Sequence, residues 1–360
     1  MNRRLDTFHT GKYLFLADIC IDTSIINEAM NVFCRMPVFP ETVSHLKENA
    51  FEKAVFSESK LEENPATYDQ VCRITSHDRE NFSQDMSAIE VINIAEAIRL
   101  VDNRLNEELS PELISEIHEE LISSLNNIQD EKGSYRNGGL KADAKWLEAE
   151  YTPPFSKIDI NLLIKTLIEW LENDLSEFNP IVKAILLHLH LKKIQPFFNA
   201  NAHTARIMEI WYLKKNNIRV LPYILVQIYK GNKSEYYKHV SEFYKSSDAT
   251  SFINFVCEFI KDDVFAVRDK NFEAFSTVIS EKHLDKLLEN KEIIKRQYEL
   301  LKLLKENKLT FRQEDLQLKA LFTKLYGKVS RTTVTRDITK LLNLGLIIET
   351  SEGFVFNEKI

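Results

Sequence analysis

The chain has 360 residues, a formal net charge of −7 and only 8 glycines, where average usage of roughly 7% would give about 25. Folds built on sheets, barrels or Rossmann-type loops use glycine for tight turns and phosphate contacts, so this scarcity favours helices. With 44% hydrophobic and 28% charged residues, the chain can bury a sizeable core. This excludes disordered, collagen-like and disulfide-scaffold proteins.

The charge is unevenly distributed along the chain. Residues 291–360 carry 14 Lys and Arg against 9 Asp and Glu, a net charge of +5, so that residues 1–290 carry −12. Since phosphate binding needs Lys and Arg, any contact with nucleic acid is expected in the C-terminal fifth.

Four scattered cysteines without a CxxC pair, no secretory signal and no long apolar run predict a cytoplasmic protein without a membrane contact.

The first two thirds of the chain are predicted to be mainly helical. Residues 1–83 form an N-terminal helical region, and apolar residues at helical spacing predict a helix over 84–104. Ser110-Pro111 begins the next helix, because proline is favoured at the first helical position. Residues 130–155 are rich in glycine and proline and predict a hairpin or extended flap.

Helices then resume at 159–175, 180–193 and 203–216, with a loop at 195–202 between the last two. Residues 84–265 are predicted to form one core, followed by a helical connector at 266–290. An amphipathic pattern over 281–304 predicts a single long helix there.

Residues 291–360 differ in kind from the rest. Helices are expected at 300–308, 313–326 and 330–344, followed by two short strands around Ser351-Glu352-Gly353. This order is typical of a winged helix-turn-helix. The predicted fold class is therefore all-α, with a small β-hairpin flap in the core and a C-terminal winged helix.

The loop between the two apolar helices carries the most specific signal. The stretch from Lys193 to Arg206 (KIQPFFNANAHTAR) resembles the core motif of the Fic (Fido) family, HxFx(D/E)GN(G/K)RxxR. Gly133–Arg136, Tyr151–Pro154 and the 162–171 helix resemble the neighbouring flap and helix of that family. The resemblance covers roughly residues 84–260.

This resemblance implies a Fido-type helical core and a nucleotidyltransferase activity. Family members typically transfer AMP from ATP onto a hydroxyl of a target protein (AMPylation), with Mg²⁺ as the second cofactor. The histidine of the motif takes up the hydroxyl proton, its acidic residue holds Mg²⁺, and its asparagine and the following amides form an anion hole. The chemistry fits these residue types, because a base must titrate near neutral pH and Mg²⁺ prefers carboxylate oxygen.

The candidate catalytic positions are Gln195, Asn201 and Arg206. Gln195 stands at the base position, where an amide cannot take up a proton. Asn201 and Arg206, the second arginine of the motif, are retained. His188 and His190 on the preceding helix are the only nearby alternatives for a base.

The candidate nucleotide-binding positions are Asn199, Ala200, Ala202 and His203, together with Arg206. Asn199 stands at the metal position and is a weaker Mg²⁺ ligand than a carboxylate, so we assign no metal ligand. Ala200 and Ala202 replace glycines and would hinder a left-handed backbone if the loop requires one. A purely structural interpretation also stays open, in which Asn201 caps the following helix.

A second family feature is an inhibitory helix with the pattern (S/T)xxxE(G/N), whose glutamate pairs with the second arginine of the motif. The segment from Met86 to Val91 resembles it and makes Glu90 the candidate inhibitory residue, opposite Arg206. The alternative is that Glu90 is a solvated charge on its helix.

The candidate DNA-binding residues lie on the last predicted helix. Ser330 can cap it, and Arg331, Thr333 and Arg336 would then stand in its first turns, where hydroxyls and arginines suit contacts with phosphates and base edges. A protein contact is the alternative for this domain.

Three functions therefore remain open. The chain is a bacterial-type Fic pseudoenzyme that binds ATP weakly or not at all and acts on an unknown target protein by binding it. Alternatively, it is a Fic enzyme with altered nucleotide-transfer chemistry, or a DNA-binding regulator that uses residues 291–360 and keeps the Fic core as a scaffold or as the interface of a homodimer.

Overall fold

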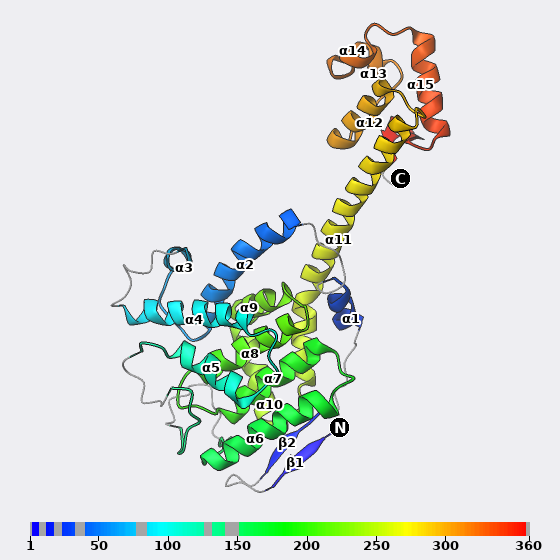
Figure 1. Ribbon diagram of the computed structural model, residues 1–360. Coiled ribbons are helices and arrows are strands. Elements are labelled where there is room, and N and C mark those ends of the chain that lie inside the picture. Colours follow the sequence, from blue (N-terminus) through cyan, green and yellow to red (C-terminus); the bar gives the residue numbers. More distant parts are fainter. Residues whose placement is uncertain are drawn as a thin grey trace. The chain divides into compact units, whose positions relative to one another are not determined.

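A computed structural model describes residues 2–6, 12–17, 24–32, 40–76, 85–125, 132–140 and 151–357. The chain divides into two compact units, Met1–Ala266 and Val267–Ile360. Both are mainly helical, and the strands of the described residues form two antiparallel pairs (Figure 1). Among the described helices, none combines the length and the apolar character that a membrane span requires.

The first unit contains one strand pair and most of the helices of the chain. In chain order its elements are β1 (Arg3–Leu5), β2 (Tyr13–Phe15), α1 (Ser24–Met30), α2 (Pro40–Leu61), α3 (Tyr68–Thr75), α4 (Met86–Asn103), α5 (Pro111–Leu121), α6 (Lys157–Glu169), a π-helical turn (Trp170–Asp174), α7 (Pro180–Ile194), α8 (Asn201–Lys215), α9 (Leu221–Gly231), α10 (Lys233–Ser246) and α11 (Thr250–Glu289), which continues into the second unit.

Helix α7 is the centre of the first unit. Every residue from Ile181 to Ile194 is buried, the lysines and histidines among them included, so this helix has no face turned to solvent. Asn179 caps it by accepting a hydrogen bond from the backbone N–H of Ile181, and Pro180 occupies its first position. Figure 1 shows α5, α6, α8, α9 and α10 around it.

The N-terminal region packs within this unit and is only partly helical. It begins with the β1–β2 pair rather than with a helix. In β2 the alternate residues Tyr13 and Phe15 are buried, the period of a strand with one face on a core, and Phe15 packs against Trp170. Helix α2 lies against α9 and α4, which brings its last turn to the start of α8.

The predicted flap can be followed only in part. Residues 132–140 and 151–155 are described and contain no strand, and residues 126–131 and 141–150 lie outside the described part of the chain. The backbone N–H of Arg136 donates to the carbonyl of Pro196, which joins this segment to the loop before α8.

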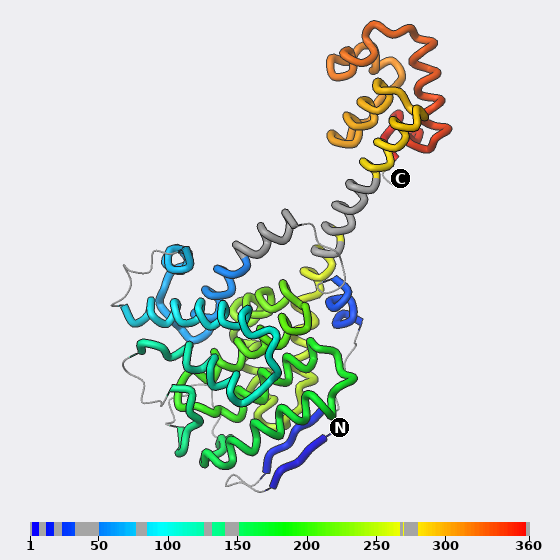
Figure 2. The backbone as a smooth tube through the Cα atoms, in the orientation of Figure 1, coloured from blue at the N-terminus to red at the C-terminus, as the bar shows by residue number. Residues whose placement is uncertain are grey.

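The second unit is built from short helices and a strand pair. Its further elements are α12 (Lys295–Asn307), α13 (Asp315–Leu318), α14 (Ala320–Tyr326), α15 (Arg331–Asn343), β3 (Ile347–Thr350) and β4 (Gly353–Phe356). Figure 2 traces this path from α12 to the red hairpin at the end of the chain. The expected single helix over 281–304 is wrong, because α11 ends at Glu289 and Lys291 adopts a left-handed conformation with φ 59°.

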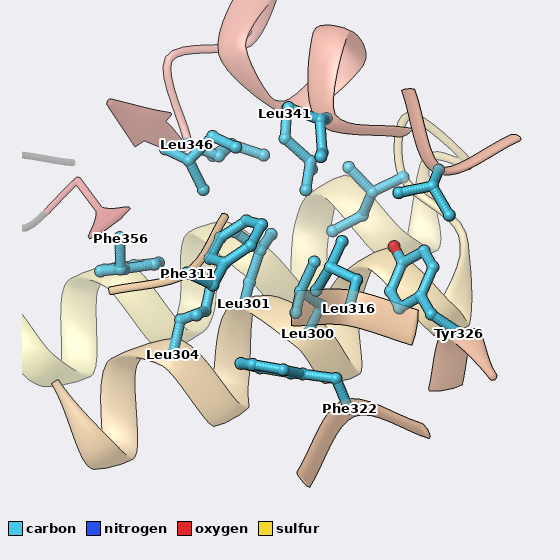
Figure 3. Packing of buried hydrophobic residues seen from close by; sticks show 14 of the residues in the cluster. Leu300, Leu301, Leu304, Phe311, Leu316, Phe322, Tyr326, Leu341, Leu346 and Phe356 are labelled. Atoms are coloured by element: carbon cyan, nitrogen blue, oxygen red, sulfur yellow. The ribbon is translucent and has the colours of Figure 1, made fainter. Parts of the chain in front are cut away.

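One apolar cluster holds the second unit together. It includes Leu300 and Leu304 from α12, Phe322 from α14, Leu341 from α15 and Phe356 from β4. These side chains point toward one another between the helices and the hairpin (Figure 3). Helix α15 therefore has one face fixed on this core and one face turned outward.

Candidate functional site

The loop between α7 and α8 turns through two left-handed residues. Gln195 ends α7 with φ 49° and ψ 66°, and Ala200 precedes α8 with φ 53° and ψ 15°. Ala200 stands at a glycine position of the expected motif, so the loop does require the backbone that glycine adopts most easily. Ala202 lies inside α8 and has no such requirement.

Asn201 holds this loop closed and does not cap α8. It is the first residue of the helix, whose capping position is Ala200, without a side-chain cap. Its Oδ1 accepts from the backbone N–H of Phe197 at 2.9 Å, and its Nδ2 donates to the carbonyl of Phe197 at 2.7 Å. Phe197 itself is fully buried and stacks on His118, with 3.6 Å between ring centroids.

Arg206 is buried with two carboxylates from the end of α2. Its Nε lies 2.8 Å from both carboxylate oxygens of Glu58, and its Nη2 lies 2.9 Å from Oε1 of Glu62. Arg206 and Glu58 are both 0% exposed, and Nη1 of Arg206 donates to the Tyr236 hydroxyl at 3.4 Å. All three nitrogens of the guanidinium therefore donate hydrogen bonds to groups of the fold.

His203 joins the same cluster between two carboxylates. Its Nδ1 lies 2.6 Å from Oε1 of Glu58, and its Nε2 lies 3.3 Å from Oε1 of Glu90. Burial lowers the pKa of His203, but the hydrogen bonds with Glu58 and Glu90 raise it by more than burial lowers it. The resulting pKa is about 9. Burial also raises the pKa of Glu58, and the charges of Arg206 and His203 outweigh it, so that the net pKa is lowered. The cluster is therefore a set of charged groups at neutral pH.

The predicted pairing of Glu90 with Arg206 needs correction. Glu90 contacts His203 and accepts a hydrogen bond from Nδ2 of Asn64 at 2.9 Å, whereas Arg206 is paired with Glu58 and Glu62. Helix α4 passes beside the site, but it is the end of α2 that covers the arginine.

Glu58 and Glu62 are the residues that the sequence reasoning missed. A signal was present, because Ser59, Glu63 and Asn64 match the pattern (S/T)xxxE(G/N) without exception. The match is offset by one residue from the carboxylate that reaches Arg206, and Glu63 instead faces Lys233 at 3.7 Å. The pattern could have identified the segment, but not the paired glutamate.

Gln195 stands where the motif places its base. Its backbone carbonyl accepts a 2.7 Å hydrogen bond from Nε of Arg136, a buried residue in the first part of the predicted flap. His188 and His190 are both 0% exposed and engaged elsewhere, His188 with Glu209 and Tyr236. His190 lies 3.0 Å from the Tyr13 hydroxyl. Burial lowers the pKa of both histidines.

The residues at the site do not fit Mg²⁺ and ATP as the motif would hold them. Asn199, at the metal position, offers an amide instead of a carboxylate, and the described residues contain no group of three or more His, Cys, Asp or Glu suited to a metal. Arg206, the cation expected to meet phosphate, is already neutralised by Glu58 and Glu62.

The outward face of α15 has the opposite charge arrangement. Arg331, Arg336 and Lys340 are exposed along it, and none of them forms an ion pair with another described residue. The only acid of α15, Asp337, is 2% exposed. It accepts hydrogen bonds from Arg296, Gln297 and Tyr326 inside the unit. The charged side chains on the outward face of α15 are therefore all positive.

Two of the three predicted DNA-binding residues lie on this face. Arg331 and Arg336 are exposed, whereas Thr333 is half-buried and its hydroxyl lies 2.9 Å from that of Ser330. Ser330 caps α15 by accepting from the backbone N–H of Thr333. Thr333 thus serves the helix start, and the free hydroxyl of this turn belongs to Thr332.

Comparison with known proteins places the site in a wider context. Residues 108–213 match the Fic/DOC family model, a span that runs from α5 into the last turn of α8 and contains the loop described above. A Fic family protein from Desulfovibrio desulfuricans is similar in structure, with a TM-score of 0.55 and 19% identity over 95% of this chain and 98% of the other.

Two further solved structures are similar over the larger part of the chain. Fic-1 from Caenorhabditis elegans has a TM-score of 0.53 and 17% identity, covering 71% of this chain and 72% of the other. A Fic domain containing signaling protein from Bacteroides thetaiotaomicron has a TM-score of 0.52 and 14% identity, covering 70% and 96%. At these identities the structures establish the shared fold.

Proposed function

Because this chain belongs to the Fic/DOC family, whose members commonly transfer AMP from ATP to proteins, we propose that it is a pseudoenzyme of that family. It keeps the fold and acts by binding another protein, without transferring AMP. A fold alone does not fix an activity, so the proposal rests on the residues of the site.

The observation that carries this proposal is the amide of Gln195 at the base position. The loss of a general base typically costs about 10²–10⁴-fold in rate. His188 and His190 are buried and bonded to other groups, and His118, which stacks on Phe197 of the same loop, is also 0% exposed. None of these buried rings can meet a hydroxyl that arrives from a target protein.

The covered Arg206 adds a second obstacle of a different kind. Removal of Glu58 or Glu62 would free the guanidinium for an anion, but it would leave Gln195 and Asn199 unchanged. Removal of either glutamate therefore raises the affinity of Arg206 for phosphate. It does not restore AMP transfer, because the losses at Gln195 and Asn199 both act on the transition state of that reaction.

A binding role is supported by exposed apolar side chains near the loop. Phe155 is 51% exposed and Phe198 39%. A Cβ atom built on Gly139 would lie 3.4 Å from the Phe155 ring, and one on Gly138 would lie 3.9 Å from the Phe198 ring, so both rings flank the same short segment. Large exposed apolar groups that gather in this way favour protein contact.

The test combines calorimetric titration with ATP, with and without Mg²⁺, and a radiolabelled AMP transfer assay on cell lysate. We expect no transfer by the wild-type chain, by Glu62→Gly or by Gln195→His alone. The matched positive variant combines Glu62→Gly with Gln195→His, Asn199→Asp, Ala200→Gly, Ala202→Gly and His203→Arg, and it should gain measurable self-modification.

Transfer by the wild-type chain that Gln195→Ala abolishes would overturn the pseudoenzyme and favour a Fic enzyme with altered chemistry. Transfer that Gln195→Ala leaves intact would point to another base. Both outcomes are distinguished from mere nucleotide binding, because the radiolabel must become covalently attached to protein.

We infer a second function for the other unit, namely that residues 291–360 form a winged helix that binds duplex DNA as a regulator. The supporting observation is the burial of Asp337, which leaves Arg331, Arg336 and Lys340 on a face of α15 without an acid. Unpaired cations on a helix that can enter a groove suit phosphate and base-edge contacts.

This second function is tested by the migration of a 20-base-pair DNA duplex with the full chain. A shift at about 50 mM salt, where phosphate contacts are strong, is expected, and it should weaken steeply as salt rises. Absence of a shift would leave a protein contact as the role of this unit.

A further inference from the structure

The hairpin β3–β4 differs in charge from the helix beside it in the same unit. Residues 347–356 contain Glu349 and Glu352, both exposed, and neither Lys nor Arg. Arg312 lies beside the turn, and its Nε donates to the carbonyl of Glu352 at 3.3 Å. Both carboxylates of the hairpin stay without an ion pair among the described residues.

The outward face of α15 can by itself supply phosphate contacts on both sides of a groove. Arg331 and Lys340 are nine positions apart, which corresponds to about 14 Å along a helix at 1.5 Å per residue. The major groove of B-DNA is about 12 Å wide and admits an α-helix. With 3.6 residues per turn, nine positions also place the two side chains about 180° apart around the helix axis. In a groove that admits α15, each would therefore face a different phosphate wall, whereas the major groove of duplex RNA is too narrow.

The core of the unit fixes which face of α15 is turned outward. Val334, Ile338 and Leu341 are buried on the inner side, and Asp337 is held there by Nη2 of Arg296 at 2.7 Å and by Nε2 of Gln297 at 2.8 Å. On the outer side the hydroxyl of Thr335 accepts from Nε2 of Gln313, which also ties the preceding segment to this helix.

We propose that α15 contacts the DNA duplex and that the acidic hairpin β3–β4 is held off the phosphate backbone by repulsion. This inference rests on the proposed DNA binding of the second unit and assigns the contacts within it. A hairpin that contacted the backbone would bring Glu349 and Glu352 against phosphates, and like charges at close range oppose binding.

The experiment measures the affinity of the full chain for a mixed-sequence 20-base-pair DNA duplex across a range of salt concentrations. For the wild type, three phosphate contacts predict a slope of log K against log salt of about −2.7, and Arg331→Ala or Lys340→Ala should each reduce its magnitude by about 0.9. The paired substitution Glu349→Gln with Glu352→Gln should raise affinity about two- to fivefold, the scale of exposed charge interactions.

Arg312→Ala is the matched control, because it removes an exposed cation beside the hairpin and leaves α15 intact. It should change affinity by less than about twofold. If Arg312→Ala weakens binding as much as Arg331→Ala, or if the paired hairpin substitution weakens it, the hairpin contacts the DNA and this inference fails while DNA binding stands. No binding by the wild type overturns both, and circular dichroism verifies that each variant is folded.

Discussion

The first unit buries its key cations, whereas the second exposes its own. In the first unit, Arg206 and His203 lie among Glu58, Glu62 and Glu90, carboxylates that other helices bring to α8. On α15 the acid is buried and the cations face outward. The number of charges on a helix therefore says little about what the helix can bind until the partners of those charges are known.

The largest effect on stability is expected when Glu58, the central carboxylate of the first unit, is replaced. Glu58→Gln would leave His203 and Arg206 with too little negative charge, and breaking a buried ion pair typically costs about 3–5 kcal/mol. Denaturant unfolding should detect this loss. Glu90→Gln is the matched control, because its carboxylate is 30% exposed, and it should cost less than about 1 kcal/mol. Equal losses for the two variants would contradict the central role of Glu58.

A rise in pH should weaken the same cluster through His203. Its pKa in the folded chain is about 9, above the unfolded value of about 6.5. The stabilisation by the protonated ring is therefore complete below about pH 6.5 and is lost as pH rises through about 9, an effect on the order of 3 kcal/mol. Chemical denaturation between pH 6 and 10, a range chosen to bracket both values, measures it.

The control for this pH dependence is His203→Arg, which keeps a positive charge across the whole range. Lys192 and Lys193 are also buried, which lowers the pKa of each to about 8, and they contribute the opposite slope above that pH. The difference between the two proteins isolates the histidine. Parallel profiles would show that His203 does not titrate as described.

Substitution by glycine should change the free energy of unfolding in opposite directions at Ala200 and Ala202, the two alanines at glycine positions of the motif. Ala200 adopts a left-handed conformation, which costs a non-glycine residue about 1–2 kcal/mol, so Ala200→Gly should stabilise by about 0.5–1 kcal/mol after the entropy of glycine is included. Ala202 is helical, and Ala202→Gly should destabilise by about 0.5–1 kcal/mol. Thermal unfolding of both variants tests this, and changes of the same sign would refute it.

The smallest effect on stability is expected for the exposed cations of α15 in the second unit. Arg331→Ala and Lys340→Ala remove exposed cations without ion pairs among the described residues, so each should alter the free energy of unfolding by no more than about 0.5 kcal/mol. Calorimetric unfolding of the full chain measures this change. A loss above about 1 kcal/mol would mean that these side chains support the fold.

Much of the fold could be predicted from local pattern. The helical class follows from the few glycines, and α7 from its apolar run between Asn179-Pro180 and Gln195. The loop before α8 and its family resemblance follow from the order of residues 193–206. The N-terminal strand pair was missed, because strands of three residues show too short an alternation. The break between α11 and α12 was missed too, since an amphipathic period can continue across a tight turn.

The sequence by itself determined which side chains occupy the motif, including the amide at Gln195 and the alanine at Ala200. Only the tertiary structure decided that Arg206 meets Glu58, 148 positions away, and that Asp337 is withdrawn from the face of α15. The reason is physical: residue types and spacing are local properties of the chain, whereas the partner of a charge depends on which distant helices the core packs together, and at short range that partner decides whether the charge is available to a ligand.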